Sequence, residues 1–212
     1  MNSLSNARRE YLGRPFDESD ADTDPWRQFA LWFEDARAHE VDATAMALST
    51  VDASGQPSSR MVLLKGLEGG GFVFYTNFQS RKGRDLASNP RAALMFYWPT
   101  DNRQVRIEGL VERVSDAEAD RYFASRPPDS RVAAVASPQS DSISSRAALE
   151  QRFAALQTQF PNADMGRPPH WGGYRLVPRV FEFWQGRPSR LHDRLRYECH
   201  DDGSWQRVRL AP

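Results

Sequence analysis

A change in hydrophobic periodicity near residue 44 constrains the fold of this chain more than any other feature. From Thr44 to Val114, apolar and polar residues alternate in short runs. These runs are separated by turns rich in Gly, Pro, Asn or Asp. This pattern is typical of half-buried strands joined by hairpins, and it returns from residue 172 to the C-terminus. Because closing such a sheet removes its exposed edges, the sequence predicts an antiparallel β-barrel with added helices, a mainly β fold of the α+β class.

We expect about nine strands, with helices inserted between the fifth and the sixth. The strands cover residues 44–51, 58–65, 72–76, 92–98, 104–114, 172–177, 180–185, 194–200 and 205–210. The run 104–114 shows the alternation clearly, since Val105 and Ile107 share one face while Arg106 and Glu108 share the other.

Local capping signals predict the helices. Asp24 before Pro25 is an N-cap followed by a first-turn proline, which opens an amphipathic helix to about residue 39. Ser80 caps a short helix to about residue 88, and Ser115 with Glu118 forms a capping box for a helix to about residue 125. Two further helices are expected at about residues 131–136 and 149–160.

The first 24 residues differ from the rest of the chain. They carry Asp17, Glu18, Asp20, Asp22 and Asp24 with almost no aliphatic residues between them. Such a segment cannot bury enough apolar area to order by itself. We therefore expect a mobile N-terminal arm at residues 1–24 and a single domain at residues 25–212, and we assign the acidic stretch no role.

Composition excludes several classes of function. The 28 basic and 28 acidic residues cancel, which argues against bulk binding to nucleic acid or to acidic membranes. No apolar run is long enough to span a membrane, and the first 24 residues lack the apolar core of a signal peptide. Zinc-like spacing, a Walker loop, G-x-G-x-x-G and G-x-S-x-G are absent, so no metal site is predicted. With Cys199 as its single cysteine, the chain forms no intrachain disulfide, and we expect a cytoplasmic location.

Only two of the 28 basic residues are lysines, and both fall in unusual clusters. Lys65 ends the apolar run that begins at Arg60, where a buried cation needs an anionic partner. Lys82 and Arg81 open the helix that Ser80 caps, and cations there oppose the helix dipole unless an anion binds between them. The alternative reading is that these cations lie in water at a strand edge and in a solvated turn.

Two more clusters of polar residues could converge on a ligand. Tyr122, Arg126 and Ser130 recur at four-residue spacing across a helix end, which is either an anion site or an ordinary helix end. Period two places Arg190, His192 and Arg194 on one strand face, where they would repel unless an anion or a planar ring lies against them. The alternative is a solvated, arginine-rich strand.

Taken together, these clusters resemble the pyridoxine (pyridoxamine) 5'-phosphate oxidases, which make pyridoxal 5'-phosphate. The resemblance runs in order from Arg8 to Pro212. The matching strings are RREY, RMVLLK, FYTN with SRK, RQVRIEG, YFASRPPDS, SPQS, WGGYR, EFWQG, RLHDR and the terminal RLAP. Departures from the family pattern, at Pro128 and Pro138, affect no residue on which the assignment depends.

The resemblance implies a fold, a cofactor and an assembly. The fold would be an FMN-binding split barrel, and the protein would be a homodimer with FMN at the subunit interface. The implied FMN-binding residues are Arg60, Met61, Val62, Leu63, Leu64, Lys65, Tyr75, Thr76, Arg81, Lys82, Gln104, Gln139, Ser140, Trp184 and Arg194. The implied substrate-binding residues are Arg8, Arg9, Glu10, Tyr11, Lys65, Tyr122, Arg126, Ser130, Arg190, Leu191 and His192, of which Arg190 and His192 would be catalytic.

The implied reaction is the oxidation of pyridoxine 5'-phosphate or pyridoxamine 5'-phosphate by O2 to pyridoxal 5'-phosphate, in vitamin B6 biosynthesis and salvage. It would release H2O2, and NH3 from the amine. Rival readings are a flavin- or haem-binding split barrel without oxidase activity, a reductase using another flavin-like cofactor, and an oligonucleotide-binding barrel. A second anion site beside the flavin separates the oxidase from a flavin carrier, and zero net charge counts against nucleic acid.

Overall fold

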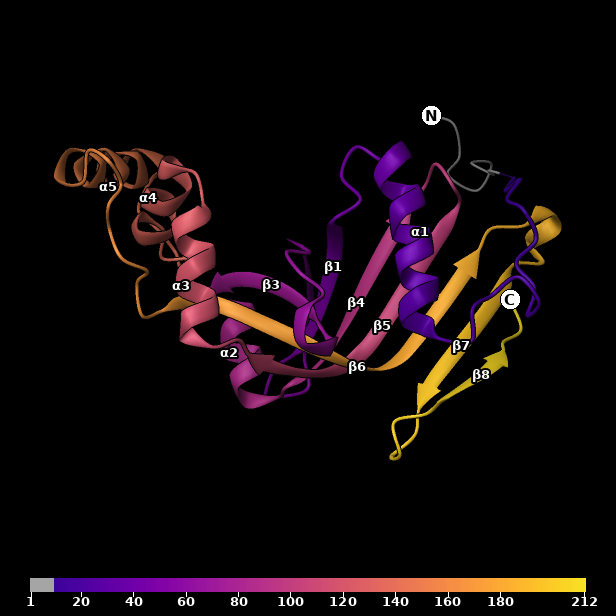
Figure 1. Cartoon of the computed structure of the whole chain (residues 1–212). Coiled ribbons are helices and arrows are strands. Elements are labelled where there is room, and N and C mark those ends of the chain that lie inside the picture. The colour runs from indigo at the N-terminus through magenta and orange to yellow at the C-terminus, as the bar shows by residue number, and fades with distance from the viewer. Residues whose placement is uncertain (1–9) are drawn as a thin grey trace. The chain divides into compact units, whose positions relative to one another are not determined.

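A computed structural model describes residues 10–212, which form five α-helices and eight β-strands (Figure 1). The helices are α1 (Pro25–His39), α2 (Arg81–Ser88), α3 (Asp116–Ser125), α4 (Pro128–Ala136) and α5 (Arg146–Gln159). The strands are β1 (Ala45–Val51), β2 (Pro57–Leu63), β3 (Phe72–Asn77), β4 (Arg91–Trp98), β5 (Arg103–Arg113), β6 (Trp171–Gln185), β7 (Asp193–Cys199) and β8 (Trp205–Arg209). Short 3-10 turns lie at Glu68–Gly70 and Pro188–Arg190.

The strands form one sheet in the order β2-β1-β4-β5-β6-β7-β8, and β3 also pairs with β6. The order ends at β2 and β8 without joining them, as a split barrel requires. The pairings of β6 with β3 and with β7, and of β7 with β8, are antiparallel, as the hairpin pattern predicts. The mainly β, α+β fold expected from the alternation is confirmed.

The capping signals give the helices correctly. The Asp24 side chain accepts a hydrogen bond from the Trp26 amide at the start of α1, and Ser80 accepts one from the Gly83 amide in α2. Helix α3 begins as the capping box predicts, with Ser115 accepting from the amide of Glu118. Helix α4 begins three residues earlier than expected, and α5 begins at Arg146, capped by Ser145.

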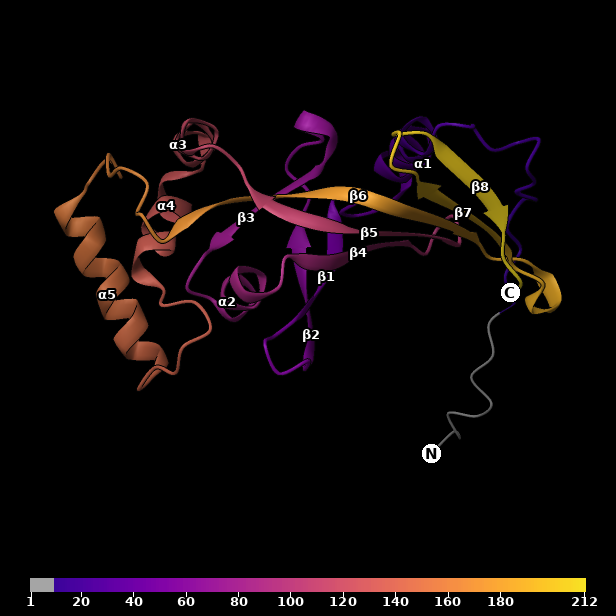
Figure 2. The ribbon, with the colours of Figure 1, turned by 90° about the horizontal axis from the view of Figure 1, so that it is seen from below.

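The expectation of nine strands is wrong, because the sixth and seventh predicted strands are one. Strand β6 runs without a break through Pro178, as Figure 2 shows. Its residues 171–176 pair with β3, and its residues 180–185 pair with β7. Pro178 lies between the two pairing segments, where its missing N–H leaves no bond of either ladder unmade.

Contacts along the chain group into two compact units. Unit 1 contains the chain up to Leu48 together with Ala93–Gly109 and Pro178–Pro212, and unit 2 contains Ser49–Ala92 and Leu110–Val177. The boundary falls within strands, so the single domain expected from chain length stays a prediction.

The core of unit 1 lies under helix α1. Phe29 and Trp32 are at most 4% exposed, and the Phe29 ring lies 5.3 Å from that of Phe96. Trp32 meets Phe183 of β6 edge-to-face at 5.4 Å. Phe16, from the segment expected to be an arm, joins this core at 5% exposure and lies 4.7 Å from Trp32.

The N-terminal segment thus buries apolar surface against the core of unit 1, through Phe16. The mobility of residues 1–24 stays a prediction, and residues 1–9 lie outside the described part of the chain.

Unit 2 combines β3 and the first part of β6 with helices α2 to α5. Val73, Val114 and Ala119 form a buried cluster against which Tyr75 packs. Helices α4 and α5 pack against each other (Figures 1 and 2), and no residue of α5 is fully buried in this chain. In the described residues, 10–212, no helix is long and apolar enough to cross a membrane.

Candidate functional site

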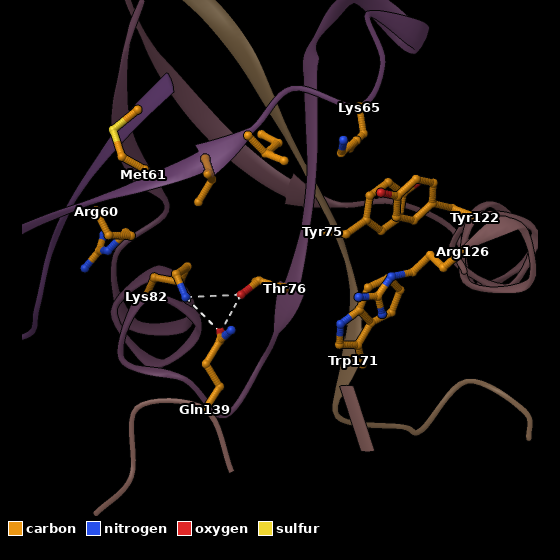
Figure 3. Close-up of a pocket in the computed structure, with 12 residues that line it drawn as sticks. Arg60, Met61, Lys65, Tyr75, Thr76, Lys82, Tyr122, Arg126, Gln139 and Trp171 are labelled. Carbon is orange, nitrogen blue, oxygen red and sulfur yellow. Dashed lines mark hydrogen bonds between the residues drawn. The ribbon is translucent and has the colours of Figure 1, made fainter. Parts of the chain in front are cut away.

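Unit 2 contains a cavity of about 510 Å³ between β2, β3, α2 and the end of α3 (Figure 3). A volume of this size suits a small organic ligand or cofactor. The side chains that line it are Arg60, Met61, Val62, Leu63, Lys65, Tyr75, Thr76, Lys82, Tyr122, Arg126, Gln139 and Trp171. Eleven of these twelve are residues predicted from the sequence, and they come from segments as far apart as β2 and the loop after α4.

Lys82 is the most buried cation of the cavity, with 8% of its surface exposed. It stands in the first turn of α2, where its Nζ donates to Gln139 Oε1 at 2.8 Å and to Thr76 Oγ1 at 3.2 Å (Figure 3). Burial, followed by repulsion from Arg60, lowers the pKa of Lys82 to about 8. The ammonium is therefore held by neutral oxygens in a place that disfavours its charge.

Arg60 reaches the cavity from β2, whose residues alternate between half-buried and exposed as period two predicts. Its Nη1 donates to Thr50 Oγ1 at 2.7 Å, and its Nη2 lies 3.7 Å from Asp85 Oδ2. Burial lowers the pKa of Arg60, and Asp85 partly offsets this. Asp85, at 4% exposure, also accepts from Thr50 and raises the pKa of Lys82. One buried carboxylate thus serves two cations, which leaves this end of the cavity positive.

An aromatic wall closes the other end of the cavity. The rings of Tyr75 and Tyr122 stack with centroids 3.8 Å apart and planes 14° apart, and Trp171 lies parallel to Tyr75 at 5.5 Å. A Cβ on Gly173 would come within 2.7 Å of both the Tyr75 ring and Val114, so only glycine lets the ring lie this close to β6. Burial raises the pKa of Tyr75 to about 12 and that of Tyr122 in the same direction, so both phenols keep their protons.

Arg126 lies beside this wall at the C-terminal end of α3. Its guanidinium carbon is 4.7 Å from the centre of the Trp171 ring, a cation–π contact (Figure 3). Its Nη1 is buried and has no hydrogen-bond partner among the described residues. Burial lowers the pKa of Arg126. Because an unmade hydrogen bond on a buried charged group is costly, this nitrogen is suited to an incoming anion.

Four predicted residues of unit 2 lie outside the cavity lining. Leu64 is buried in the core at 6% exposure, Arg81 and Ser140 are exposed, and Ser130 is half-buried in α4. The structure therefore brings together most, and not all, of the cations and hydroxyls that the sequence singled out.

The remaining described candidates belong to unit 1. Tyr11, Trp184 and His192 form an aromatic group in which the His192 ring lies 4.7 Å from Trp184 and 5.4 Å from Tyr11. Gln104 is half-buried in β5, whereas Glu10, Arg190 and Leu191 are exposed. Arg8 and Arg9 lie outside the described residues.

The expectation that Arg190, His192 and Arg194 share one strand face is wrong. Strand β7 begins only at Asp193, and Arg190 ends a 3-10 turn in which Ser189 and Arg190 have φ of 56° and 62°. Period-two alternation does not hold through such a left-handed turn. Arg194 is not a free cation either, since Glu182 Oε1 accepts from its Nε at 3.0 Å and its Nη2 at 2.8 Å.

Residue-by-residue reasoning missed Trp171 and the two buried carboxylates, Asp85 and Glu182. A signal for Trp171 was present in the pair Gly172-Gly173 that follows it, since glycines within a strand mark close approach of another group. The carboxylates gave no clear signal, because their arginine partners, Arg60 for Asp85 and Arg106 and Arg194 for Glu182, lie on other elements of the fold. Among residues 10–212, no group of three or more His, Cys, Asp or Glu side chains could hold a metal ion.

The sheet and the cavity define a split-barrel protein with a basic, aromatic-lined pocket. A structure from Nostoc punctiforme PCC 73102, a pyridoxamine 5'-phosphate oxidase-related, FMN binding protein, shares this fold. Its TM-score is 0.73 at 20% identity, and the match covers 89% of this chain and 98% of that one. PhzG from Burkholderia lata 383, solved with tetrahydrophenazine-1-carboxylic acid, has a TM-score of 0.87 at 32% identity, covering 95% of this chain and 99% of its own.

Sequence comparison identifies the family. The pyridoxamine 5'-phosphate oxidase model matches residues 34–160, and the model of the pyridoxine 5'-phosphate oxidase C-terminal dimerisation region matches residues 171–212. A pyridoxine/pyridoxamine 5'-phosphate oxidase of Ralstonia pickettii (strain 12J) is 55% identical over 213 residues, covering 100% of both chains. One of Bordetella avium (strain 197N) is 56% identical over 211 residues, covering 99% of this chain and 100% of its own. The chain belongs to the pyridoxamine 5'-phosphate oxidase family.

Proposed function

We propose that this protein oxidises pyridoxine 5'-phosphate and pyridoxamine 5'-phosphate to pyridoxal 5'-phosphate, with FMN as cofactor and O2 as oxidant. The products are H2O2 and, from the amine, NH3. The observation that carries the proposal is the cavity of unit 2. Among residues 10–212, its lining contains four cations, Arg60, Lys65, Lys82 and Arg126, and no carboxylate, and parallel aromatic rings lie at one end. Such a cavity suits planar ligands that carry phosphate, and the full-length relatives are named for these two substrates.

The residues at the α2 end of the cavity fit the phosphate of FMN. Arg60 and Lys82 supply the charge, and Thr76 and Gln139 already converge on the Lys82 ammonium. Each charge-assisted hydrogen bond contributes on the order of 1.5–3 kcal/mol. The remaining residues of the proposed FMN-binding set are Arg81 at the start of α2, Ser140, residues 61–65, Tyr75, Gln104, Trp184 and Arg194. FMN held there would supply the hydride-accepting chemistry and the reaction with O2.

The other end of the cavity fits the phosphate of the substrate. The orphaned Arg126 Nη1 is a ready donor, and the Tyr122 phenol stays protonated because burial raises its pKa. Lys65 and Ser130 complete the proposed phosphate site. Holding the phosphate, which does not react, orients the reacting carbon.

Arg190 and His192 would act on the alcohol or amine end of the substrate. The backbone N–H of Arg187 donates to His192 Nδ1 at 3.0 Å, so a neutral His192 carries its proton on Nε2. Burial, followed by Arg190, lowers the pKa of His192, which favours this neutral form. His192 would therefore donate from Nε2 to the hydroxyl oxygen or amine nitrogen of the substrate and orient it, while Arg190 contributes positive charge. Arg8 and Tyr11 would close over the bound substrate as a lid, and Arg9, Glu10 and Leu191 complete the proposed substrate-binding set.

The proposed assembly is a homodimer with FMN at the subunit interface. It is supported by the match of residues 171–212 to a dimerisation region, because that segment contains Trp184, Arg190, His192 and Arg194. The cytoplasmic location stays a prediction.

The decisive experiment is to purify the protein, identify the flavin and follow peroxide release after adding pyridoxine 5'-phosphate. We expect a yellow dimer that releases one peroxide per pyridoxal 5'-phosphate. The Arg190→Met variant should keep its flavin and lose at least about 100-fold in turnover, as loss of a group acting in the transition state does. A flavoprotein that releases no peroxide would instead support the flavin-carrier reading, and a colourless protein would contradict FMN as the cofactor. Equal losses of flavin affinity and turnover would contradict the role of Arg190.

A further inference from the structure

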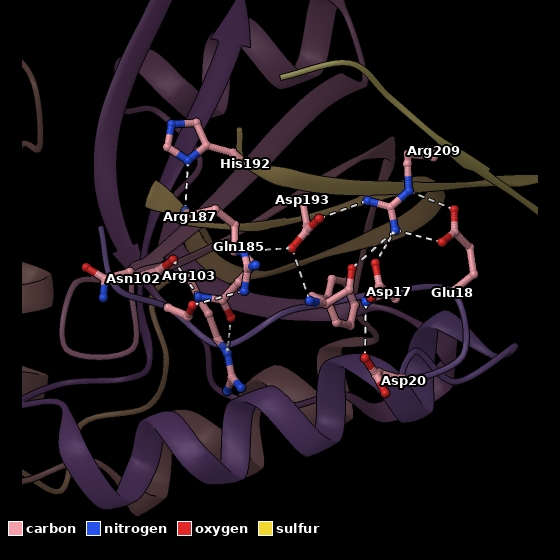
Figure 4. A network of polar contacts seen from close by, with 12 residues as sticks. Asp17, Glu18, Asp20, Asn102, Arg103, Gln185, Arg187, His192, Asp193 and Arg209 are labelled. Atoms are coloured by element: carbon pink, nitrogen blue, oxygen red, sulfur yellow. Dashed lines mark hydrogen bonds and ion pairs between the residues drawn. The ribbon is translucent and has the colours of Figure 1, made fainter. Parts of the chain in front are cut away.

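The acidic stretch of the N-terminal segment meets a single arginine of the last strand. Arg209 of β8 donates from Nε to Glu18 Oε1 at 2.8 Å and from Nη2 to Glu18 Oε2 at 2.6 Å, a two-pronged contact (Figure 4). The same Nη2 reaches Asp17 Oδ1 at 3.1 Å. The Glu18 pKa is lowered to about 2, chiefly by these hydrogen bonds. The stretch is therefore bound to the body of unit 1 by ionic contacts as well as by Phe16.

The guanidinium of Arg209 also connects the segment to the turn that carries His192. Its Nη1 donates to Asp193 Oδ1 at 2.9 Å, and the other oxygen of Asp193 accepts from the Phe16 amide at 3.1 Å (Figure 4). Asp193 thus lies between Arg209 and the backbone of the N-terminal segment, immediately after His192 in the chain. It also lies 3.5 Å from Arg187 Nε.

Arg187 connects Asp193 both to His192 and to Gly13, which lies two residues after Tyr11. Its backbone N–H holds His192 Nδ1, and its Nη1 donates to the Gly13 carbonyl at 3.3 Å. Two residues before Gly13, the Tyr11 ring lies edge-on to His192 and to Trp184. A Cβ on Gly186 would come within 2.8 Å of the Tyr11 ring, so the ring is closely fitted.

The turn between Arg187 and His192 needs such external support. Ser189 and Arg190 both adopt left-handed backbone conformations that residues other than glycine rarely take. Conformations of this kind persist where the surrounding contacts hold them. The contacts of Arg187 and Asp193 flank this turn on either side.

We propose that Arg209 is a positioning residue, which clamps residues 16–18 to Asp193 and thereby holds Tyr11 against His192. This inference rests on the proposed function for the roles of Tyr11 and His192. In this proposal the acidic residues Asp17 and Glu18 accept three hydrogen bonds from Nε and Nη2 of Arg209, two separate nitrogens that the forked guanidinium of an arginine supplies. A lysine at position 209 would keep the charge but lose the fork that reaches Glu18 and Asp193 together.

Arg209→Gln in the full-length flavoprotein tests the clamp, with Arg196→Gln as the matched control. Arg196 pairs with Glu198 at 3.0 Å, and its side chain is 36% exposed, as that of Arg209 is. We expect the Phe16 amide to exchange its hydrogen about tenfold faster in Arg209→Gln and at the wild-type rate in Arg196→Gln. Unchanged exchange in Arg209→Gln would overturn the clamp whatever the enzyme catalyses.

Kinetics then test whether the clamp positions Tyr11. Arg209→Gln should raise KM for pyridoxine 5'-phosphate about tenfold with kcat changed less than threefold and flavin content unchanged, and Arg209→Lys should fall between it and the wild type. Combined with Tyr11→Ala, Arg209→Gln should add less than a twofold further loss. Faster exchange with normal KM, or fully multiplicative losses in the double variant, would overturn the positioning role. A normal KM in Tyr11→Ala would overturn both that role and the lid of the proposed function.

Discussion

In unit 1 the guanidinium of Arg194 meets Glu182 through two hydrogen bonds, whereas in unit 2 the guanidinium of Arg126 has a buried nitrogen that finds no partner within residues 10–212. The difference extends to their neighbours. Glu182 also accepts from Arg106 at 3.3 Å, so one buried carboxylate ties two strands to β6. Around the cavity of unit 2, Asp85 faces both Arg60 and Lys82, and the pKa of each cation is lowered by burial.

This contrast separates two uses of the same side chain. A cation that has a carboxylate within the fold stabilises the fold, and its removal leaves the carboxylate unpaired. A buried cation that lacks one costs stability until an anion binds. Counting arginines in the sequence cannot distinguish the two uses, whereas the carboxylates that lie next to each arginine in the structure do. Arg175 of unit 2, for example, pairs with Glu112 and Glu118 as Arg194 pairs with Glu182.

The largest expected effect comes from removing the carboxylate of unit 1. Glu182→Ala should lower the free energy of unfolding by about 3 kcal/mol, because Arg194 and Arg106 lose a partner that is itself 7% exposed. Urea denaturation measures this. Glu198→Ala, which removes the exposed partner of Arg196, should cost less than about 1 kcal/mol. Equal losses in the two variants would show that the buried carboxylate stabilises the fold no more than the exposed one does.

The second effect concerns Arg126, whose loss should impair function and spare the fold. Arg126→Met should reduce kcat/KM for pyridoxine 5'-phosphate about 30-fold, equivalent to about 2 kcal/mol for one charge-assisted contact. The free energy of unfolding should stay the same or rise, since a buried nitrogen without a partner is removed. Arg152→Met, on the exposed face of α5, is the control and should change neither quantity. Destabilisation by several kcal/mol would show that Arg126 serves the fold.

The third effect follows from the pKa of about 8 for Lys82. Between pH 7 and pH 9 its charged fraction falls about tenfold, so FMN should bind about tenfold more weakly at pH 9, as flavin fluorescence quenching can measure. In the protein without FMN, the effect of pH on folding stability has the opposite sign to its effect on FMN binding. The folded state holds fewer protons than the unfolded state between the folded pKa of about 8 and the ordinary lysine pKa of 10.5, so the stability that this group contributes rises with pH across that window. A flat binding profile, or the same profile in Lys82→Met, would contradict the assignment.

What the sequence predicted well is local. The N-caps at Asp24 and Ser80 and the alternation along β2 depend on neighbours within a few residues, and each is confirmed. The gathering of Arg60, Tyr75, Lys82 and Arg126 around one cavity was also expected, though only through the resemblance to a family.

What the sequence could not predict depends on distant partners. Whether Pro178 ends a strand depends on which strands pair on either side of it, and the burial of Phe16 depends on Trp32 and Phe183. The turn at Ser189 and Arg190 interrupts the period-two alternation because its backbone is left-handed. The sequence did not predict this, since neither residue type signals a left-handed backbone. The pairing of Arg194 with Glu182 joins two antiparallel strands across a register that single-sequence reasoning does not supply.

The uninterrupted course of β6 through Pro178 limits how this gene can change in length. Successive side chains point to opposite faces, so deleting one codon between positions 177 and 179 would keep the pairing of Trp171 with Asn77 while inverting every side chain from Val180 to Gln185. Glu182 would then point away from Arg194, and Trp184 away from His192. Insertions and deletions in related genes should therefore be found in the connecting loops or, within this strand, in even numbers.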